Sequence, residues 1–205
     1  MRPLYSYAIS IIFMNLHSPL YHYWTGVLPG ELCDLIINLL EPTSKTTGAV
    51  GSTEFGSQGA FLEQYRNSTV SGVGRPHWLY GIVEYYLQQA NEATFHYNLG
   101  ETQIIQYSTY AEGQQYTWHR DSGGPPDDQG RIRKLSMSVQ LDDPATFRGG
   151  EFQLTNFAGT VLEPEEFKPR GSIIIFPSMC LHRVAPVTQG VRRSLVAWFL
   201  GPTFR

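Results

Sequence analysis

The sequence predicts an α+β protein in which helices come first and an antiparallel β core follows. Apolar residues recur at helical spacing in the N-terminal part of the chain, whereas the remainder consists of short runs rich in Ile, Val, Phe and Tyr. Clusters of Gly, Pro, Asp and Asn separate those runs, and no helical stretch stands between them. A sandwich, jelly roll or barrel is therefore expected rather than a parallel sheet.

The helical part contains two candidate helices. The first is expected to open with Leu28–Glu31 and to stop at Glu41–Pro42. Its apolar residues at helical spacing are Leu32, Leu35, Ile36, Leu39 and Leu40. The second candidate extends from His77 to Phe95 without an internal proline, and the segment Thr43–Gly59 between the two is rich in Gly, Ser and Thr and reads as a loop. We expect residues 1–99 to form an N-terminal tail and a helical support region.

The β part is predicted to occupy residues 100–205 and to form one structural unit with the helices packed beside it. Short strands are expected at Thr102–Tyr110, Leu135–Leu141, Glu151–Thr155, Ser172–Phe176 and Arg193–Leu200. Gly149 and Gly150 lie between two of these strands and indicate a tight turn.

Composition limits the classes of partner. The chain has 205 residues, enough to bury a core without disulfides or a structural metal, so any metal site is free to be catalytic. The net charge of −3 and the pI of about 6.1 give no basic field for a phosphate backbone, and no nucleic acid partner is expected. Cys33 and Cys180 cannot form a disulfide framework and favour a reducing compartment, so a soluble cytoplasmic protein is expected.

The N-terminus carries a short apolar stretch. Leu4–Phe13 follows Arg2, lacks a small-x-small cleavage site and is much shorter than the roughly 20 residues of a membrane span. Met14 comes directly after it. We expect residues 1–13 to be an over-extended start or a tail, and no membrane partner is expected.

A histidine and an aspartate stand one residue apart where a predicted strand gives way to a loop. In extended backbone, His119 and Asp121 point to the same face, and His182 follows another apolar strand further along the chain. Two histidines and a carboxylate are the ligand set of the facial triad that leaves positions open on non-haem Fe(II). An ordinary hydrogen-bonded pair of histidine and aspartate is the alternative for the first two.

Arg192, the tenth residue after His182, adds a possible anion site. An arginine inside a β core is costly unless an anion pairs with it, and its planar guanidinium suits the far carboxylate of a dicarboxylic cosubstrate that chelates the metal. Alternation along the strand places Arg192 and Arg193 on opposite faces. One of the two is therefore expected to lie on the strand without a role in the site.

Several segments of the chain resemble a known family. They are Tyr110–His119, Arg133–Leu141, Gly149–Phe152 and Phe176–Trp198. Together with the H-x-D pair, His182 and Arg192, they resemble the Fe(II)/2-oxoglutarate-dependent dioxygenases, in particular the prolyl 4-hydroxylase-like branch. The resemblance covers about residues 100–203, and the helical part matches only in its general plan.

This resemblance implies a double-stranded β-helix, or jelly roll, with Fe(II) at its open end. It implies that His119, Asp121 and His182 bind the metal, and that Arg192 and Tyr110 bind the remote carboxylate of 2-oxoglutarate. The implied reaction consumes O2, releases succinate and CO2 and hydroxylates an organic substrate. A peptidyl proline is the default substrate of this branch, and ascorbate is a reductant to be considered.

Other functions remain open at this point. A jelly-roll domain that only binds a ligand would be expected to lack one of the four positions, and a zinc hydrolase with the same ligands would give Arg192 no role. A nucleic-acid demethylase is disfavoured by the acidic balance. The substrate, a peptide or a small molecule, is not specified, and neither is the oligomeric state.

The parts that contact a substrate are predicted only from position. The loops Thr43–Gly59 and Ser122–Gly130 are expected to close over it. At most one of Tyr116 and Trp118, which lie close to His119 in the sequence, is expected to line the mouth of the site.

Overall fold

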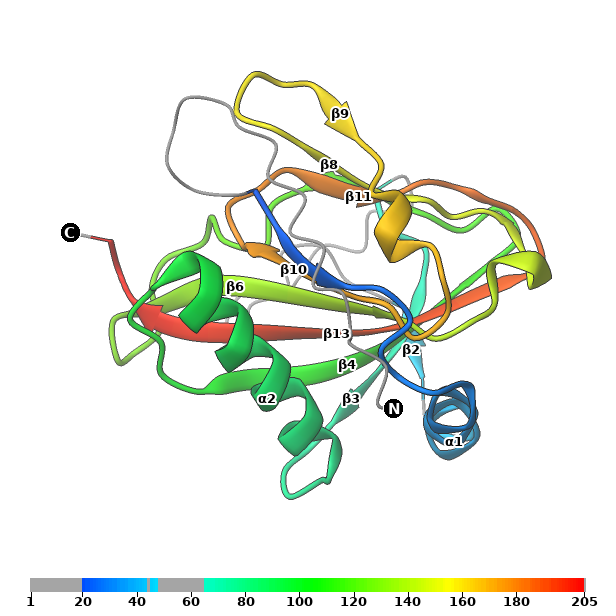
Figure 1. The fold of residues 1–205 in the computed structure, drawn as a ribbon, viewed down its shortest axis with the longest axis horizontal. Helices are drawn as coiled ribbons and strands as arrows, with labels where there is room; N and C mark the ends of the chain where they lie inside the picture. The colour runs from blue at the N-terminus through cyan, green and yellow to red at the C-terminus, as the bar shows by residue number, and fades with distance from the viewer. Residues whose placement is uncertain (1–19, 44, 48–64, 205) are drawn as a thin grey trace, which may run out of the picture.

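A computed structural model describes residues 20–43, 45–47 and 65–204, and Figure 1 shows their arrangement. The strands are β1 (His22–Trp24), β2 (Thr46–Thr47), β3 (Thr69–Val73), β4 (Thr102–Ala111), β5 (Tyr116–His119), β6 (Arg131–Gln140), β7 (Arg148–Gly149), β8 (Phe152–Thr155), β9 (Val161–Leu162), β10 (Ile173–Pro177), β11 (His182–Val184), β12 (Val187–Gln189) and β13 (Val191–Pro202). The α-helices are α1 (Gly30–Leu40) and α2 (Leu79–Ala90), and shorter helical turns are Asn91–Phe95, Pro144–Thr146 and Glu165–Phe167.

The strands form two main antiparallel sheets. The larger sheet has the order β1-β10-β6-β13-β4-β3-β2, and the smaller has the order β5-β11-β8-β9, with β7 and β12 forming a separate pair. Consecutive strands such as β4 and β5, or β10 and β11, belong to different sheets, so the chain passes back and forth between them (Figure 1). This is the predicted double-stranded β-helix, and the prediction of an antiparallel β core with few helices is confirmed.

Strand β10 shows why the core has this form. Its run of apolar residues is buried on both faces: Ile173 and Ile175 join a cluster with the helices, whereas Ile174 and Phe176 join a second cluster with Phe152 of the smaller sheet. A strand buried on both faces needs a continuous apolar run instead of alternation. The large sheet is therefore covered by helices on one side and faces the smaller sheet on the other.

Helices α1 and α2 pack their apolar faces against the larger sheet, and α2 runs across its strands in Figure 1. Helix α1 buries Cys33, Ile36 and Leu40, but Leu35 and Leu39 are 54% and 44% exposed. The apolar set expected for this helix is thus divided, because only one face of the helix contacts the sheet. No helix in the described ranges has the length and apolar character needed to cross a bilayer.

The expectation that the region before residue 99 is only helical was wrong. Strand β3 pairs along β4, β2 pairs with β3, and β1 pairs with β10 at the other edge of the same sheet. These strands are short, and their partners lie far along the chain, so no local periodicity predicts them. Residues 1–13 and most of Thr43–Gly59 lie outside the described residues, and the division of the chain at residue 99 stays a prediction.

The paired glycines lie at the end of β7, where Gly149 pairs with Val187 of β12, and not in a separate tight turn as the sequence indicates. Gly149 and Gly150 have φ angles of +71° and +69°, in the left-handed region where a side chain is disfavoured. A Cβ on Gly149 would overlap the carbonyl oxygen of Pro186. Close approach of two backbones, together with the left-handed φ, therefore requires glycine at this position.

Truncation of Ile36 to alanine should lower the free energy of unfolding by about 2–5 kcal/mol, because the fully buried side chain leaves a cavity between α1 and the sheet. Leu35→Ala, on the exposed face of the same helix, is the matched control and should change it by less than about 1 kcal/mol. Urea denaturation followed by circular dichroism measures both. Equal losses in the two variants would contradict the packing of α1 described here.

Candidate active site

Two histidines from different parts of the sequence face each other across the smaller sheet. Strand β11 pairs antiparallel with β5, and the register sets His182 directly opposite His119. Their ring centroids are 4.1 Å apart. The pairing of the two strands therefore determines how closely the rings approach.

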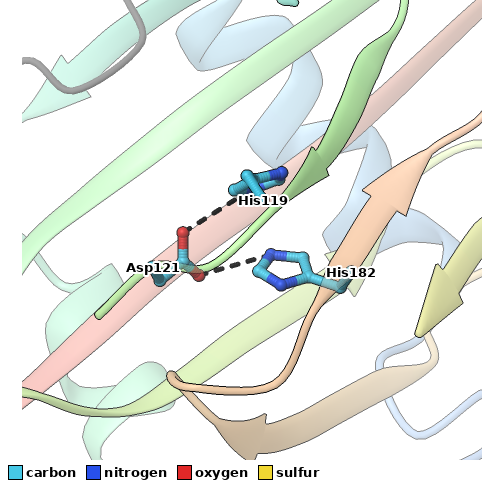
Figure 2. A group of neighbouring side chains, drawn as sticks. All are labelled: His119, Asp121 and His182. Atoms are coloured by element: carbon cyan, nitrogen blue, oxygen red, sulfur yellow. Dashed lines mark ion pairs between the residues drawn. The ribbon is translucent and has the colours of Figure 1, made fainter. Parts of the chain in front are cut away.

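Asp121 completes the group from the loop that follows β5 (Figure 2). Its Oδ1 lies 3.6 Å from Nε2 of His119, and its Oδ2 lies 3.4 Å from Nε2 of His182. One ligand atom from each residue lies within 4.8 Å of the other two. Three donors that converge in this way from one side can occupy one face of a metal ion.

Hydrogen bonds to the backbone orient both imidazoles. Nδ1 of His119 is 2.8 Å from the carbonyl oxygen of Thr117, and Nδ1 of His182 is 3.0 Å from that of Cys180. A carbonyl only accepts, so each Nδ1 carries the hydrogen and donates it. Each Nε2 lone pair is then left for a metal, which is the usual arrangement behind histidine ligands.

Electrostatics favours the ligand forms of the side chains. Burial, and then the neighbouring His182, lowers the pKa of His119 to about 3, so its imidazole is neutral at physiological pH. Burial by itself would raise the pKa of Asp121, but His182, His119, Arg133 and the Ser136 hydrogen bond together lower it to about 2. A neutral imidazole beside a carboxylate is the protonation state that divalent metals require.

The group lies at a cavity of about 630 Å³ between the two sheets. Tyr116 lines this cavity and stacks on His119, with ring centroids 3.5 Å apart and planes inclined by 13°. Trp118 instead contacts the guanidinium of Arg183, 4.8 Å from the ring centroid. Part of the loop Ser122–Gly130 also lines the cavity, namely Ser122, Gly123, Gly124 and Pro125. Whether this loop closes over a substrate stays a prediction.

Tyr110 and Arg192 lie side by side on neighbouring strands. They are directly paired in the β4–β13 register, and the guanidinium carbon of Arg192 is 5.8 Å from the Tyr110 ring centroid. Tyr110 lines the cavity of the metal-ligand group, whereas Arg192 lines a smaller cavity of about 190 Å³, and Phe152 lines both. The structure thus places Arg192 next to the main cavity rather than in its wall.

Arg192 is a buried cation with spare donors. It is 2% exposed, burial lowers its pKa, and its Nη1 atom has no hydrogen-bond partner among the residues that the structure describes. Arg193 points away from it and pairs with Asp142 and Glu41. The predicted alternation is therefore confirmed. Arg193 also has a structural role, because its ion pair with Glu41 links the end of α1 to β13.

The model of a known family matches residues 105–200, the segment that carries all five of these residues, and its description is "2OG-Fe(II) oxygenase superfamily". Residues 105–200, called the oxygenase segment below, thus match the 2OG-Fe(II) oxygenase superfamily. They contain the H-x-D pair, the second histidine and the following arginine on which the resemblance rests.

Curated relatives of the oxygenase segment are PKHD-type hydroxylases. The protein tll1907 of Thermosynechococcus vestitus is 39% identical over 94 residues, which are 45% of this chain and 40% of that protein. A relative from Xylella fastidiosa strain M23 is 35% identical over 99 residues, 45% of this chain and 42% of its own length. The chain thus spans about two fifths of the length of the curated relatives that it matches.

Solved structures share the fold over most of the chain. A prolyl-4-hydroxylase from Pseudomonas putida superposes with a TM-score of 0.67 at 17% identity, covering 90% of this chain and 94% of that one. A prolyl hydroxylase from Trichoplax adhaerens, in complex with a hypoxia inducible factor peptide fragment, gives 0.70 at 15% identity, covering 89% and 84%. At such identities the likeness establishes the fold alone.

Two buried serines hold the carboxylate of the oxygenase site in place. The Ser136 hydroxyl on β6 donates to Oδ2 of Asp121 at 2.7 Å and lies 2.8 Å from the Ser178 hydroxyl. The backbone nitrogens of Asp121 and Ser122 both donate to the Ser178 carbonyl. Asp121 is therefore fixed by the larger sheet even though it follows a strand of the smaller one.

Several residues of the site carry no recognisable signal in the sequence. Besides the two serines, these are Arg66, Arg133 and Trp198, which line the cavity from the larger sheet and from the segment before β3. Serines in a strand and arginines near a strand end are too common to be noticed in a single sequence. Their role arises only from the pairing of distant strands.

Replacement of Ser136 by alanine should weaken Fe(II) binding about 10- to 100-fold, because the Asp121 carboxylate loses the donor that orients it. Isothermal titration under anaerobic conditions measures the affinity. Ser172→Ala removes another fully buried serine that bonds to the backbone nitrogen of Gly26 away from the cavity, and it should leave the affinity unchanged. The same loss in both variants would show a general effect on folding instead.

Proposed function

We propose that this chain is an Fe(II)- and 2-oxoglutarate-dependent dioxygenase that hydroxylates an organic substrate. One observation carries the proposal: two imidazole Nε2 atoms and a carboxylate converge at a cavity beside a buried arginine that lacks a full set of partners. The family assignment of residues 105–200 supports the same chemistry.

In this proposal His119, Asp121 and His182 hold the metal from one side. Their backbone and serine hydrogen bonds keep the three donors in place before the metal arrives. Fe(II) together with 2-oxoglutarate supplies the activation of O2 that hydroxylates a C–H bond and yields succinate and CO2. The remaining side of the metal position is left for the cosubstrate and oxygen, which the facial arrangement permits.

Arg192 and Tyr110 bind the remote carboxylate of 2-oxoglutarate in this proposal. A dicarboxylate would supply the acceptors that the buried guanidinium lacks, and Tyr110 is its immediate neighbour. Asp142 and Glu151 contribute favourable electrostatics to Arg192, but neither forms an ion pair with it in the described part of the chain. A zinc hydrolase with the same three ligands would leave this arginine without a function.

Apolar side chains form part of the cavity wall around the reacting groups. Its inner walls come from both sheets and include Phe152, Phe176 and Val184. Apolar walls strengthen the electrostatic interactions inside and protect reactive species from solvent. The protein's share of the reaction is thus to position the reactants and to shield them in part from solvent.

The proposed substrate class is taken from the names of similar proteins. Relatives of the segment are named PKHD-type hydroxylases, and structures of similar fold are prolyl hydroxylases. We take a prolyl group in a peptide or a small molecule as the first candidate. Ascorbate as a reductant and the cytoplasmic location stay predictions.

Anaerobic addition of Fe(II) and 2-oxoglutarate should give a weak visible charge-transfer absorption that decays when O2 is admitted. Asp121→Ala should abolish the absorption, because it removes the one anionic donor among the three proposed ligands. Asp34→Ala, which removes a surface carboxylate paired with Arg170, is the control and should keep it. Absence of the absorption in the wild-type protein, with Zn(II)-dependent hydrolysis in its place, would favour the hydrolase.

Replacement of Arg192 by methionine should weaken 2-oxoglutarate binding roughly 10- to 100-fold, because the carboxylate loses a charge-assisted pair. The apo protein should be no less stable than the wild type, since the change removes an incompletely paired buried cation. Thermal denaturation with and without 2-oxoglutarate measures both effects. Arg193→Met should show the reverse pattern, a loss of stability through Asp142 and Glu41 with 2-oxoglutarate binding kept.

A further inference from the structure

Arg66 is a second buried arginine, and it borders the main cavity. It is 7% exposed, and in the described part of the chain its guanidinium has one hydrogen bond, from Nε to the Ser68 hydroxyl at 2.8 Å. No carboxylate of the described residues forms an ion pair with it. A buried guanidinium with so few acceptors is costly, and that cost is recovered when an anion binds.

The guanidinium is held in a fixed place. Arg66 stacks on the ring of Tyr116, with its central carbon 4.4 Å from the ring centroid, and its backbone forms a bridge to Tyr116. Ser68, which accepts from Nε, is fully buried. The two terminal nitrogens of the guanidinium are thus left to bind a ligand. Their orientation is determined by the Tyr116 stacking and by the Ser68 hydrogen bond.

The charge of the cavity wall favours an anion. Among the described residues that line it, the charged lysine, arginine, aspartate and glutamate side chains are Arg66, Arg120, Arg131, Arg133 and Asp121. Arg131 is paired with Glu101 and Asp127, and Asp121 interacts with the two histidines. A locally cationic cavity in a chain of net charge −3 is a feature of this site and not of the whole molecule.

The position of Arg66 separates it from the proposed cosubstrate site. Arg192 lines the smaller cavity beside Tyr110, whereas Arg66 lines the main cavity and contacts Tyr116. Tyr116 in turn stacks on His119. The Arg66 guanidinium and the ring of a proposed metal ligand, His119, thus contact the same tyrosine ring, and an anion on Arg66 would lie close to the reacting group.

We propose that Arg66 binds a carboxylate of the substrate, at a place in the cavity close to the carbon that is hydroxylated. This inference rests on the proposed function and narrows its substrate to acidic molecules. The carboxylate has two possible sources, the α-carboxylate of an amino acid or chain end and the side chain of an acidic residue beside the target. Both present the planar pair of oxygens that suits a guanidinium fork.

Two matched pairs of probes test the inference on the anaerobic protein loaded with Fe(II) and 2-oxoglutarate. The first pair is N-acetyl-L-proline and its methylamide, and the second is a capped tripeptide Ala-Pro-Glu and the corresponding Ala-Pro-Gln. Calorimetry should show that the acidic member of at least one pair binds at least about tenfold more tightly. The pair that shows the preference identifies the source of the carboxylate.

Arg66→Gln should abolish this preference while the 2-oxoglutarate charge-transfer absorption remains, and Arg66→Lys should keep part of it. Arg75→Gln is the matched control, because Arg75 also stacks on a tyrosine, Tyr80, at 3.9 Å but does not line the cavity. It should keep the full preference. Circular dichroism melts of the Arg66 variants verify that they fold.

Equal or undetectable binding of both members in both pairs would overturn the inference. So would an Arg66→Gln protein that needs more 2-oxoglutarate but keeps the preference, because the arginine would then serve the cosubstrate. Failure of the proposed function looks different, since the wild-type protein would then give no charge-transfer absorption with Fe(II) and 2-oxoglutarate. The two failures are therefore distinguished in one set of samples.

Discussion

The antiparallel pairing of β5 with β11 is the constraint on which the site depends. It sets His182 opposite His119, and Asp121 follows two residues later, within reach of both rings. A shift of one residue in this register would turn one of the histidines away from the cavity. The rest of the fold, with β8 on the far side of β11 and the larger sheet behind it, keeps that register in place.

Burial serves the chemistry and also carries a cost. The apolar surroundings keep His119 neutral and limit the acceptors available to Arg66 and Arg192, so the empty site holds cations that are not fully paired. Ser136 donates a hydrogen bond to the buried Asp121 carboxylate, and the Ser178 hydroxyl lies within hydrogen-bond distance of Ser136. Such a site is less stable without its ligands than a fully apolar core would be, and anionic ligands offset the difference.

The fold was predicted well where the signals are local. The apolar runs of the strands after residue 100 and the periodicity of α1 and α2 are properties of neighbouring residues, and the structure contains these elements with small changes of bounds. Strands β1 and β3 were missed, because their pairing with β10 and β4 links segments far apart in the sequence. Which face of α1 is buried was likewise decided by contact with the sheet.

By itself the sequence determined the donor set and its spacing: a histidine and an aspartate two positions apart, a second histidine after an apolar strand, and an arginine ten residues later. These identities define the chemistry because each side chain has a limited set of roles. Only the tertiary structure decided that Ser136 holds Asp121 and that Arg66 faces the same cavity as His119. Such contacts join segments that no pattern along the chain connects, so they exist only once the two sheets have packed together.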